Sequence, residues 1–289
     1  MNKKILFADL VLLLLNVLWG YCFLAIKDVL NELKPFQIIA LRFLIPSIIL
    51  VPIYFNSFLK LSKTDLRNFL FTGLALGLGF SFQTLGMQFS SPSKAGVFTG
   101  MLVVFVPFVY YFVSKKRISN RILIGTIISF FGLGLFSLND IKSYFFQMGD
   151  FLLISCAIIY AVHIVLNDFT FHKNPNINEN SFASFQILMS GLIGFVFSLS
   201  FEKIPSSISV KSIYLILFLS FFGSFLAYFI QTWAQKISPP SHVGILLCTE
   251  SIFACVFSYF LLNEVFGLEK ILGTIILSIG ILLISYPSK

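Results

Sequence analysis

Long stretches that lack any charged residue dominate this sequence and restrict the solvent in which it can fold. Eight such stretches, and two more with one charge each, approach the roughly 20 apolar residues of a bilayer-spanning helix. Only 11% of the chain is charged, against about 25% in a typical soluble domain. The sequence therefore predicts an all-α integral membrane protein. Its ten transmembrane helices are expected within residues 10–26, 36–55, 68–93, 95–114, 122–139, 151–167, 180–201, 212–235, 242–262 and 271–288.

The N-terminal sequence combines a basic start with an apolar run, as a secretory signal peptide does. Its apolar run is too long and no small-x-small cleavage site follows, so we expect an uncleaved first span. The connections between the spans are short, and none is long enough for a separate soluble domain. Four cysteines fall inside predicted spans, and their spacing matches no metal site or disulfide framework. They are Cys22, Cys156, Cys248 and Cys255.

Lysine and arginine are distributed unevenly between the two sets of loops. Up to residue 121, nine lie in segments predicted to face the cytoplasm and three in segments predicted to face outward, whereas the second half shows no bias. Basic residues in short loops favour the cytoplasmic side. We therefore expect a multi-pass protein of the inner (plasma) membrane with both termini in the cytoplasm. The net charge of +8 is then explained without a nucleic-acid partner.

The four residues GTII occur at 125–128 and again at 273–276, which indicates an internal duplication. At this offset of 148 residues, 12 identities fall in 45 positions and include paired prolines and glycines; earlier in each half the best offset is 141. Each half holds five spans, an odd number, so the second copy must enter the membrane from the opposite side. Such inverted repeats are a recurring plan of secondary transporters, which alternate the access to a central site. We expect halves at residues 1–139 and 149–289.

Small residues recur on one face of two predicted helices. Gly244, Cys248, Ser251, Cys255 and Ser258 are spaced by four and three residues, and at the 148-residue offset they correspond to a run that begins with Gly96 and Gly100. Small faces let helices approach closely in lipid. The stripe therefore predicts either close helix packing alone or a face that also lines a central cavity.

Two ionisable residues lie deep within predicted spans, where charges are costly and usually face an interior cavity. Glu250 lies about eight residues into its span, or roughly 12 Å. It can hold a cationic group of a substrate, take up a proton, or pair with a neighbouring helix. Arg42 lies about two turns into its span. It can clamp a carboxylate or phosphate, extend to the lipid headgroups, or pair with another helix.

The remaining candidates are polar or aromatic residues within the spans. Trp19 is far from both interfaces and can stack on a ligand or fill the core, and Asn16 lies one turn before it. His163 can titrate or serve as an ordinary hydrogen-bonding residue. Lys27, at the outer end of the first span, is expected to anchor the interface or to form an outer gate. The predicted substrate-binding residues are Asn16, Trp19, Arg42, Gln83, Thr99, His163, Tyr228, Gln231 and Glu250. Most of the 37 phenylalanines are expected to face lipid or packed helices.

Several segments resemble the EamA-type members of the drug/metabolite transporter superfamily over nearly the whole chain. They are WGYCFLAIKD at 19–28, LRF at 41–43, QTLG at 83–86, SKAGVFTGMLVVFVP at 93–107, Gly149-Asp150, and TESIF through LLNE at 249–264. The resemblance implies ten helices in two inverted five-helix bundles around a central cavity. It also implies transport of small metabolites, often by export. Tyr21, Lys116 and Ser251 depart from residues common in the family.

No motif of a catalytic site accompanies these features. The sequence has no His-Glu-x-x-His zinc pair, no nucleophile elbow and no phosphate-binding loop, so neither an enzyme nor a cofactor or metal is expected. We predict a secondary transporter that moves a small, amino-acid-like or similarly polar or amphipathic compound by alternating access, with export as the direction. A passive channel or facilitator and a non-transporting membrane scaffold are the alternatives. The protein is expected to act as a monomer or homodimer.

Overall fold

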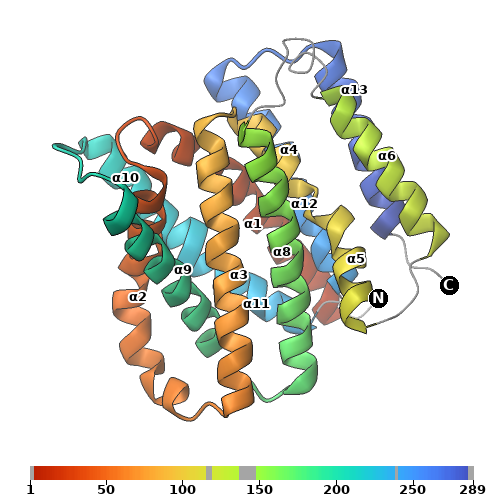
Figure 1. The fold of residues 1–289 in the computed structure, drawn as a ribbon. Helices are drawn as coiled ribbons and strands as arrows, with labels where there is room; N and C mark the ends of the chain where they lie inside the picture. The colour runs from red at the N-terminus through yellow and green to blue at the C-terminus, as the bar shows by residue number, and fades with distance from the viewer. Residues whose placement is uncertain (1–2, 115–118, 137–147, 238–239, 286–289) are drawn as a thin grey trace.

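The residues described by the computed structural model, 3–114, 119–136, 148–237 and 240–285, fold into helices and their connections, without a strand (Figure 1). An all-helical fold satisfies every backbone hydrogen bond within the segment itself, which hydrocarbon requires. The helices are α1 (Lys3–Val29), α2 (Pro35–Leu59), α3 (Lys63–Gln88), α4 (Pro92–Gly100), α5 (Leu102–Ser114), α6 (Asn120–Phe136), α8 (Met148–Lys173), α9 (Glu179–Phe201), α10 (Val210–Phe218), the π-helix η1 (Leu219–Leu226), α11 (Ala227–Ile237), α12 (Pro240–Leu262) and α13 (Leu268–Ser285).

Polar residues between the apolar stretches begin several of these helices. Ser62, Ser91, Asn178 and Ser209 each accept a hydrogen bond from a backbone N–H in the first turn of the helix that follows. Such caps satisfy a donor that has no partner within the helix. α3 ends at Gln88, within the predicted stretch 68–93, and Ser91 with the proline after it begins α4.

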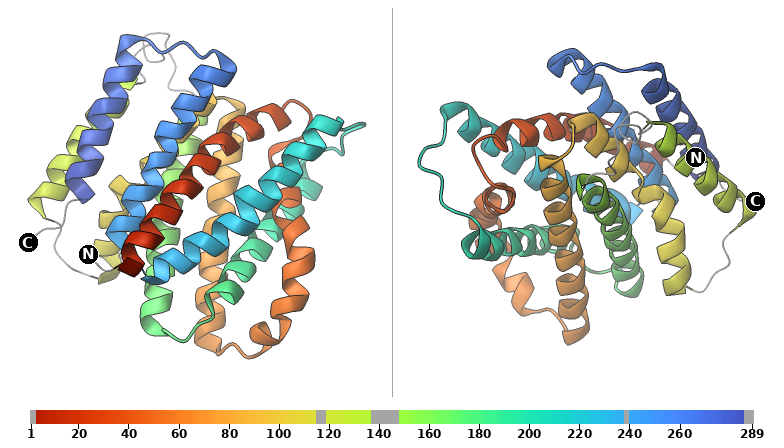
Figure 2. Two further views of the ribbon diagram at one scale, coloured as in Figure 1. Left: turned by 180° about the vertical axis from the view of Figure 1, so that it is seen from behind. Right: turned by 45° about the horizontal axis from the view of Figure 1, so that its top comes forward.

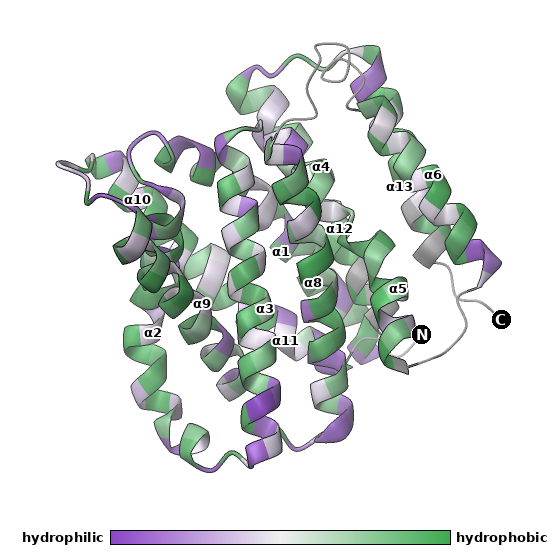
Figure 3. Ribbon diagram, viewed as in Figure 1, coloured by the Kyte–Doolittle hydropathy of each residue, from purple (hydrophilic) through white to green (hydrophobic). Residues whose placement is uncertain are grey.

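Among the described residues, seven segments are long and apolar enough to cross a membrane: Lys3–Val29, Pro35–Leu59, Lys63–Gln88, Pro92–Val113, Met148–Lys173, Glu179–Phe201 and Val210–Ile237. Two more, Asn120–Phe136 and Leu246–Leu262, are apolar but shorter. Large apolar side chains are exposed on the outside of the bundle, and hydrophilic residues gather toward the helix ends (Figure 3). Lipid is the solvent that fits such a surface. The predicted residues 137–139 and 286–288 lie outside the described part of the chain.

Two of the long segments are interrupted. α4 and α5 meet at Met101, whose N–H bonds to Phe98 O three residues back, and Pro107 lies within α5. α10 and α11 are joined by η1, in which each turn holds an extra residue. π-helical segments within α-helices are frequent at functional sites, and they shift backbone groups out of the regular helical pattern.

Small residues bring α4 against α12, as the stripe on the predicted helices indicated. A Cβ atom on Gly96 or Gly100 would overlap Ala254 or Ser251 of α12. The Cys248 thiol donates to Gly100 O at 3.0 Å, and the Ser251 hydroxyl donates to Gly96 O at 2.7 Å. The two helices therefore touch through their backbones, which is the mode of contact that lipid favours.

α6 and α13 form a second close pair at one side of the molecule (Figure 2). A Cβ atom on Gly132 would meet Leu277 N and Gly273 O, and one on Gly280 would meet Gly125 O. Glycines of each helix thus lie against the backbone of the other. Gly134, on another face of α6, has no atom within 4 Å of such a Cβ.

The ends of α1 and α2 are joined to the connection before α10 by hydrogen bonds. The Ser209 N–H and hydroxyl both donate to Glu32 at 2.7 Å, and these bonds hold the pKa of the Glu32 carboxyl below its usual range. Glu202 accepts from the N–H groups of Phe36 and Gln37 at 2.9 Å each, at the start of α2. The connections at this face therefore cap helices from distant parts of the chain.

Gly132→Ala is expected to lower the melting temperature in detergent, whereas Gly134→Ala on the same helix is not. The first change forces a methyl group against backbone atoms of α13, and overpacking of this kind costs about 1–3 kcal/mol. The second adds a methyl group in open space and gains up to ~1 kcal/mol of helix propensity. Equal melting curves for the two variants, measured by tryptophan fluorescence, would contradict the packing of α6 on α13.

Candidate functional site

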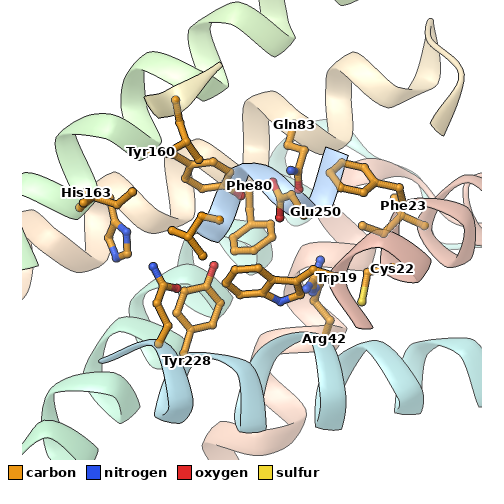
Figure 4. Close-up of a pocket in the computed structure, with 15 residues that line it drawn as sticks. Trp19, Cys22, Phe23, Arg42, Phe80, Gln83, Tyr160, His163, Tyr228 and Glu250 are labelled. Carbon is orange, nitrogen blue, oxygen red and sulfur yellow. The ribbon is translucent and has the colours of Figure 1, made fainter. Parts of the chain in front are cut away.

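One cavity lies at the centre of the bundle and collects most of the predicted binding residues (Figure 4). Its empty volume is about 540 Å³ when the open space at its mouth is included. α1, α2, α3, α5, α8, α11 and α12 all contribute to its wall. The lining residues are Trp19, Cys22, Phe23, Ile26, Arg42, Phe80, Gln83, Leu102, Tyr160, His163, Ile164, Tyr228, Gln231, Leu247 and Glu250.

Arg42 is buried, with 1% of its surface exposed, so its side chain does not extend to the headgroups. Its Nε donates to Ser224 Oγ and its Nη2 donates to Gly223 O, both at 3.0 Å. The guanidinium carbon lies 4.9 Å from the Phe43 ring centre and 4.5 Å from that of Phe80. Nη1 has no hydrogen-bond partner. The cation is thus held by neutral groups and keeps one donor nitrogen free.

The π-helix η1 supplies the acceptor that holds Arg42 and also positions Trp19. Gly223 O accepts from Arg42 Nη2 and from Trp19 Nε1, the latter at 3.3 Å. A Cβ atom on Gly223 would lie 3.0 Å from both Arg42 Nη2 and Cys22 Sγ. Only glycine therefore allows this approach without displacing its neighbours. Sequence reasoning missed η1, although the small pair Gly223-Ser224 inside an apolar span was a signal.

Glu250 is 6% exposed and makes no hydrogen bond or ion pair with the described residues. In Figure 4 it lies beside Gln83, while Arg42 lies beside Trp19 and Cys22. The cavity therefore presents one carboxyl group and one guanidinium that are not paired with each other. An ionisable group at this depth without a partner in the protein is a candidate to bind a ligand or a proton.

Aromatic rings form the wall between these charged groups. Tyr228 lies 5.9 Å from Trp19 and 6.0 Å from Phe80, measured between ring centres, and Phe80 lies 5.5 Å from Tyr160. The expectation that most phenylalanines face lipid or packed helices did not identify Phe23 and Phe80 as lining residues. Tyr160 and Cys22 were also missed, because an apolar helix in lipid does not reveal its inward face by periodicity.

His163 belongs to a closed network of buried polar side chains. Its Nε2 lies 2.6 Å from Gln186 Oε1 and 3.3 Å from Asn167 Nδ2, and Gln186 Nε2 donates to Asn167 Oδ1 at 3.2 Å. The shorter contact indicates that the Nε2–H of His163 donates to Gln186 Oε1. The sequence allowed two roles for His163, titration or ordinary hydrogen bonding, and these contacts are those of the second role. Its ring also packs edge-on against Tyr228.

Three predicted residues lie outside the cavity wall. Asn16 is fully buried and its Nδ2 donates to Leu246 O at 2.6 Å. Thr99 accepts from Gln83 Nε2 at 3.3 Å and so touches a lining residue. Lys27 Nζ donates to Met87 O at 2.8 Å, at the C-terminal end of α3. The contact of Lys27 ties α1 to α3, and a gating role for it stays a prediction.

No group of three or more histidine, cysteine or acidic side chains in the described ranges is arranged to hold a metal ion. The ligand chemistry of the cavity therefore comes from Arg42, Glu250, the amides of Gln83 and Gln231, and the aromatic rings.

Comparisons with known proteins place the chain among membrane transporters. The model of the EamA-like transporter family matches residues 6–138 and again 147–286. An uncharacterized transporter of Archaeoglobus fulgidus is 28% identical, over 98% of this chain and 87% of that protein. The S-adenosylmethionine uptake transporter of Rickettsia prowazekii is 22% identical, over 92% of this chain and 89% of that protein. A solved crystal structure shares the fold, with a TM-score of 0.72, 13% identity and coverage of 98% and 96%.

Gln186→Leu is expected to destabilise the protein by about 1–3 kcal/mol, because it leaves the buried polar groups of His163 and Asn167 without partners. Ser190→Ala, one turn further along α9, is the matched control, since its hydroxyl bonds only to Gln186 O of its own helix at 2.9 Å. Thermal unfolding in detergent measures both. If the two variants melt together, the network around His163 does not stabilise the fold.

Proposed function

Because the chain belongs to the EamA-like transporter family, we propose that it is a secondary transporter of a small, amino-acid-like compound. It works by alternating access in the plasma membrane, with both termini in the cytoplasm. The observation that carries this proposal is the central cavity, where Arg42 and Glu250 face one space without neutralising each other. The cavity lies among helices of both halves of the chain, so a movement of one half relative to the other can change its opening.

Ten membrane helices in two inverted five-helix halves, 1–139 and 149–289, are part of the proposal. The family match falls twice along the chain, and each match covers one proposed half. The glycine contacts are reciprocal: Gly132 meets Gly273, and Gly280 meets Gly125, where 125 and 273, and 132 and 280, are related by the 148-residue offset. Cys248 likewise bonds to Gly100, its own counterpart. Contacts between equivalent positions are those expected near a two-fold axis.

The charges of the cavity favour a solute that carries both an anionic and a cationic group. Nη1 of Arg42 is free to donate to a carboxylate, and Glu250 is free to accept from an ammonium group. Trp19, Phe80 and Tyr228 offer ring faces to an apolar or aromatic side chain between the two poles. The relative in R. prowazekii is named as an uptake transporter of S-adenosylmethionine, and this compound is an amino-acid derivative with both groups. An α-amino acid or close derivative therefore fits these features.

Export is the proposed direction, since many members of the family are exporters. The relative in R. prowazekii is named for uptake. A carrier runs in the direction that the gradients impose, so the direction follows from the coupling rather than from the cavity. Comparison of right-side-out and inside-out vesicles, at equal solute gradients, measures it.

A passive channel and a non-transporting membrane scaffold are the alternatives. A channel would show flux that rises linearly with concentration, whereas a carrier saturates and exchanges solute across the membrane. Proteoliposomes preloaded with unlabelled amino acids or with S-adenosylmethionine distinguish the three. Accumulation of the labelled compound by counterflow supports a carrier, and a scaffold would give no flux of any compound in a full panel.

Glu250→Gln and Arg42→Gln are expected to alter recognition of opposite ends of the solute. Wild-type protein should bind an amino acid about 10–100-fold better than its N-acetyl or its ester derivative, because a charge-assisted hydrogen bond contributes about 1.5–3 kcal/mol. The Glu250 variant should lose the discrimination against the N-acetyl compound only, and the Arg42 variant that against the ester only. Competition in the counterflow assay measures both. Loss of both preferences in either variant would contradict the assignment of Arg42 and Glu250 to opposite ends of the solute.

Proton coupling through Glu250 is a second expectation, because a buried carboxyl group without a partner in the protein can alternate between proton and solute. Transport by wild-type protein should increase when a pH gradient is imposed across the vesicle membrane. Glu250→Gln should still exchange solute but should no longer respond to that gradient. A variant that responds to the gradient as the wild type does would remove Glu250 from the coupling.

A further inference from the structure

Besides Arg42 Nη1 and the Tyr160 hydroxyl, four buried polar atoms in or beside the cavity have no hydrogen-bond partner, and these four belong to amide side chains. They are Asn16 Oδ1, Gln231 Oε1, and both Oε1 and Nε2 of Gln235. The exposed fractions of these residues are 0%, 3% and 8%. A buried polar group without a partner costs about 1–3 kcal/mol, so a group of them at one place requires a physical reason.

The three residues lie on one side of the cavity. Gln231 lines the cavity, and Gln235 lies one turn further along α11, near its end at Ile237. Asn16 lies one turn before Trp19, nearer the start of α1. Phe7 packs edge-on against Trp233 with 6.0 Å between ring centres, so the start of α1 lies beside the end of α11 (Figure 2, left). The amides therefore lie between the cavity and the membrane face where the N-terminus lies, termed here the N-terminal face.

Another cluster of buried amides among the described residues is paired, although Asn68 Nδ2 on α3 is not. In the network around His163, both polar atoms of Gln186 have partners, and Asn167 binds Gln186 through Oδ1. Gln186 is thus satisfied within the protein and needs no ligand. Gln235, by contrast, has neither of its polar atoms paired and adds nothing to helix contact that an apolar side chain would not add. The unpaired amides are therefore not explained by packing.

Several polar groups are paired near the opposite face, at the ends of α1 and α3 and the starts of α4 and α8. Lys94 at the start of α4 and Asp150 at the start of α8 form a buried ion pair with an N–O distance of 2.9 Å. Ser93 donates to Glu264, beyond the end of α12, at 2.6 Å. Lys27 binds Met87 O on the same face. These groups bond to one another across helices, while Ser90 Oγ and Glu264 Oε2 nearby have no hydrogen-bond partner. Unlike the amides, these two atoms do not lie beside a residue that lines the cavity on α11.

We propose that Asn16, Gln231 and Gln235 line a hydrophilic passage that connects the central cavity with the N-terminal face. This inference rests on the proposed transport function and adds Gln235 to the transport route. Amides donate and accept hydrogen bonds, so they can replace water around both the carboxylate and the ammonium group of a zwitterionic solute. They carry no net charge and therefore do not retain either group strongly. Such a surface suits passage, whereas Arg42 and Glu250 suit binding.

Cysteine accessibility tests the passage without any need to know the solute. Gln231→Cys, Gln235→Cys and Glu250→Cys are made singly in a variant whose four native cysteines are replaced by alanine or serine. Ala234→Cys, on the same turn of α11 but fully buried in the apolar core, is the matched control. Lys4→Cys and Ser206→Cys mark the N-terminal and the opposite face. Sealed vesicles of known orientation are treated with a small, charged methanethiosulfonate, and the mass shift is measured.

The proposal expects the Gln231→Cys and Gln235→Cys variants to react at least tenfold faster than Ala234→Cys, and only from the face that Lys4→Cys marks. If Gln235→Cys does not react while Glu250→Cys reacts from the face marked by Ser206→Cys, the passage is overturned and the transporter is left intact. Absence of reaction in all three cavity and passage variants, from both faces, overturns the cavity and hence the proposed function. Reaction of Ala234→Cys as fast as Gln235→Cys also overturns the passage. If the cysteine-free chain does not fold, the substitutions are made in the wild-type chain, whose own reaction is subtracted.

Discussion

Helices in lipid gain little by burying apolar side chains against one another, so the close approach of α4 and α12 determines much of this structure. Gly96 and Gly100 let α12 come close enough for Ser251 and Cys248 to bond to backbone carbonyls. Adjacent residues on an α-helix point about 100° apart, so fixing Ser251 against α4 directs Glu250 away from that contact. The carboxyl group thereby faces the cavity. The close approach of α4 and α12 and the orientation of Glu250 toward the cavity thus follow from the same packing arrangement.

Arg42, on the other wall of the cavity, is likewise positioned by its contacts with a neighbouring helix. The π-helix η1 presents Gly223 O, and the guanidinium binds this carbonyl and the Ser224 hydroxyl rather than a carboxylate. Two phenylalanine rings lie against the cation and lower the cost of its burial without neutralising it. Because Arg42 and Glu250 are carried by helices fixed to different neighbours, the cavity keeps both groups available to a ligand. A solute with one anionic and one cationic group can then supply the partners that Arg42 and Glu250 lack within the protein.

The helical class and most helix positions could be predicted from the sequence, because charge-free runs and polar caps are local signals. Arg42 and Glu250 could also be recognised, since an ionisable residue deep in an apolar span has few structural explanations. Phe80, Tyr160 and Gly223 could not, because their roles depend on which residues of distant helices they meet. Gln235 was missed for a related reason: an amide near a helix end reads as interfacial until its burial and its unpaired atoms are known. His163 was recognised, but its role depended on Gln186, a partner on another helix.

The central claim is that the two halves of the chain enclose one cavity that opens to one membrane face at a time. α1 and α8 are counterparts in the proposed halves, so distances between them at the two faces test the claim directly. Spin labels at Lys4 and Lys173 report on one face, and labels at Asn31 and Met148 report on the other. Pulsed electron resonance in lipid nanodiscs, with and without a transported solute, should show one distance increasing while the other decreases. Two distances that change together, or that stay constant while the labelled proteins transport solute, would contradict the account.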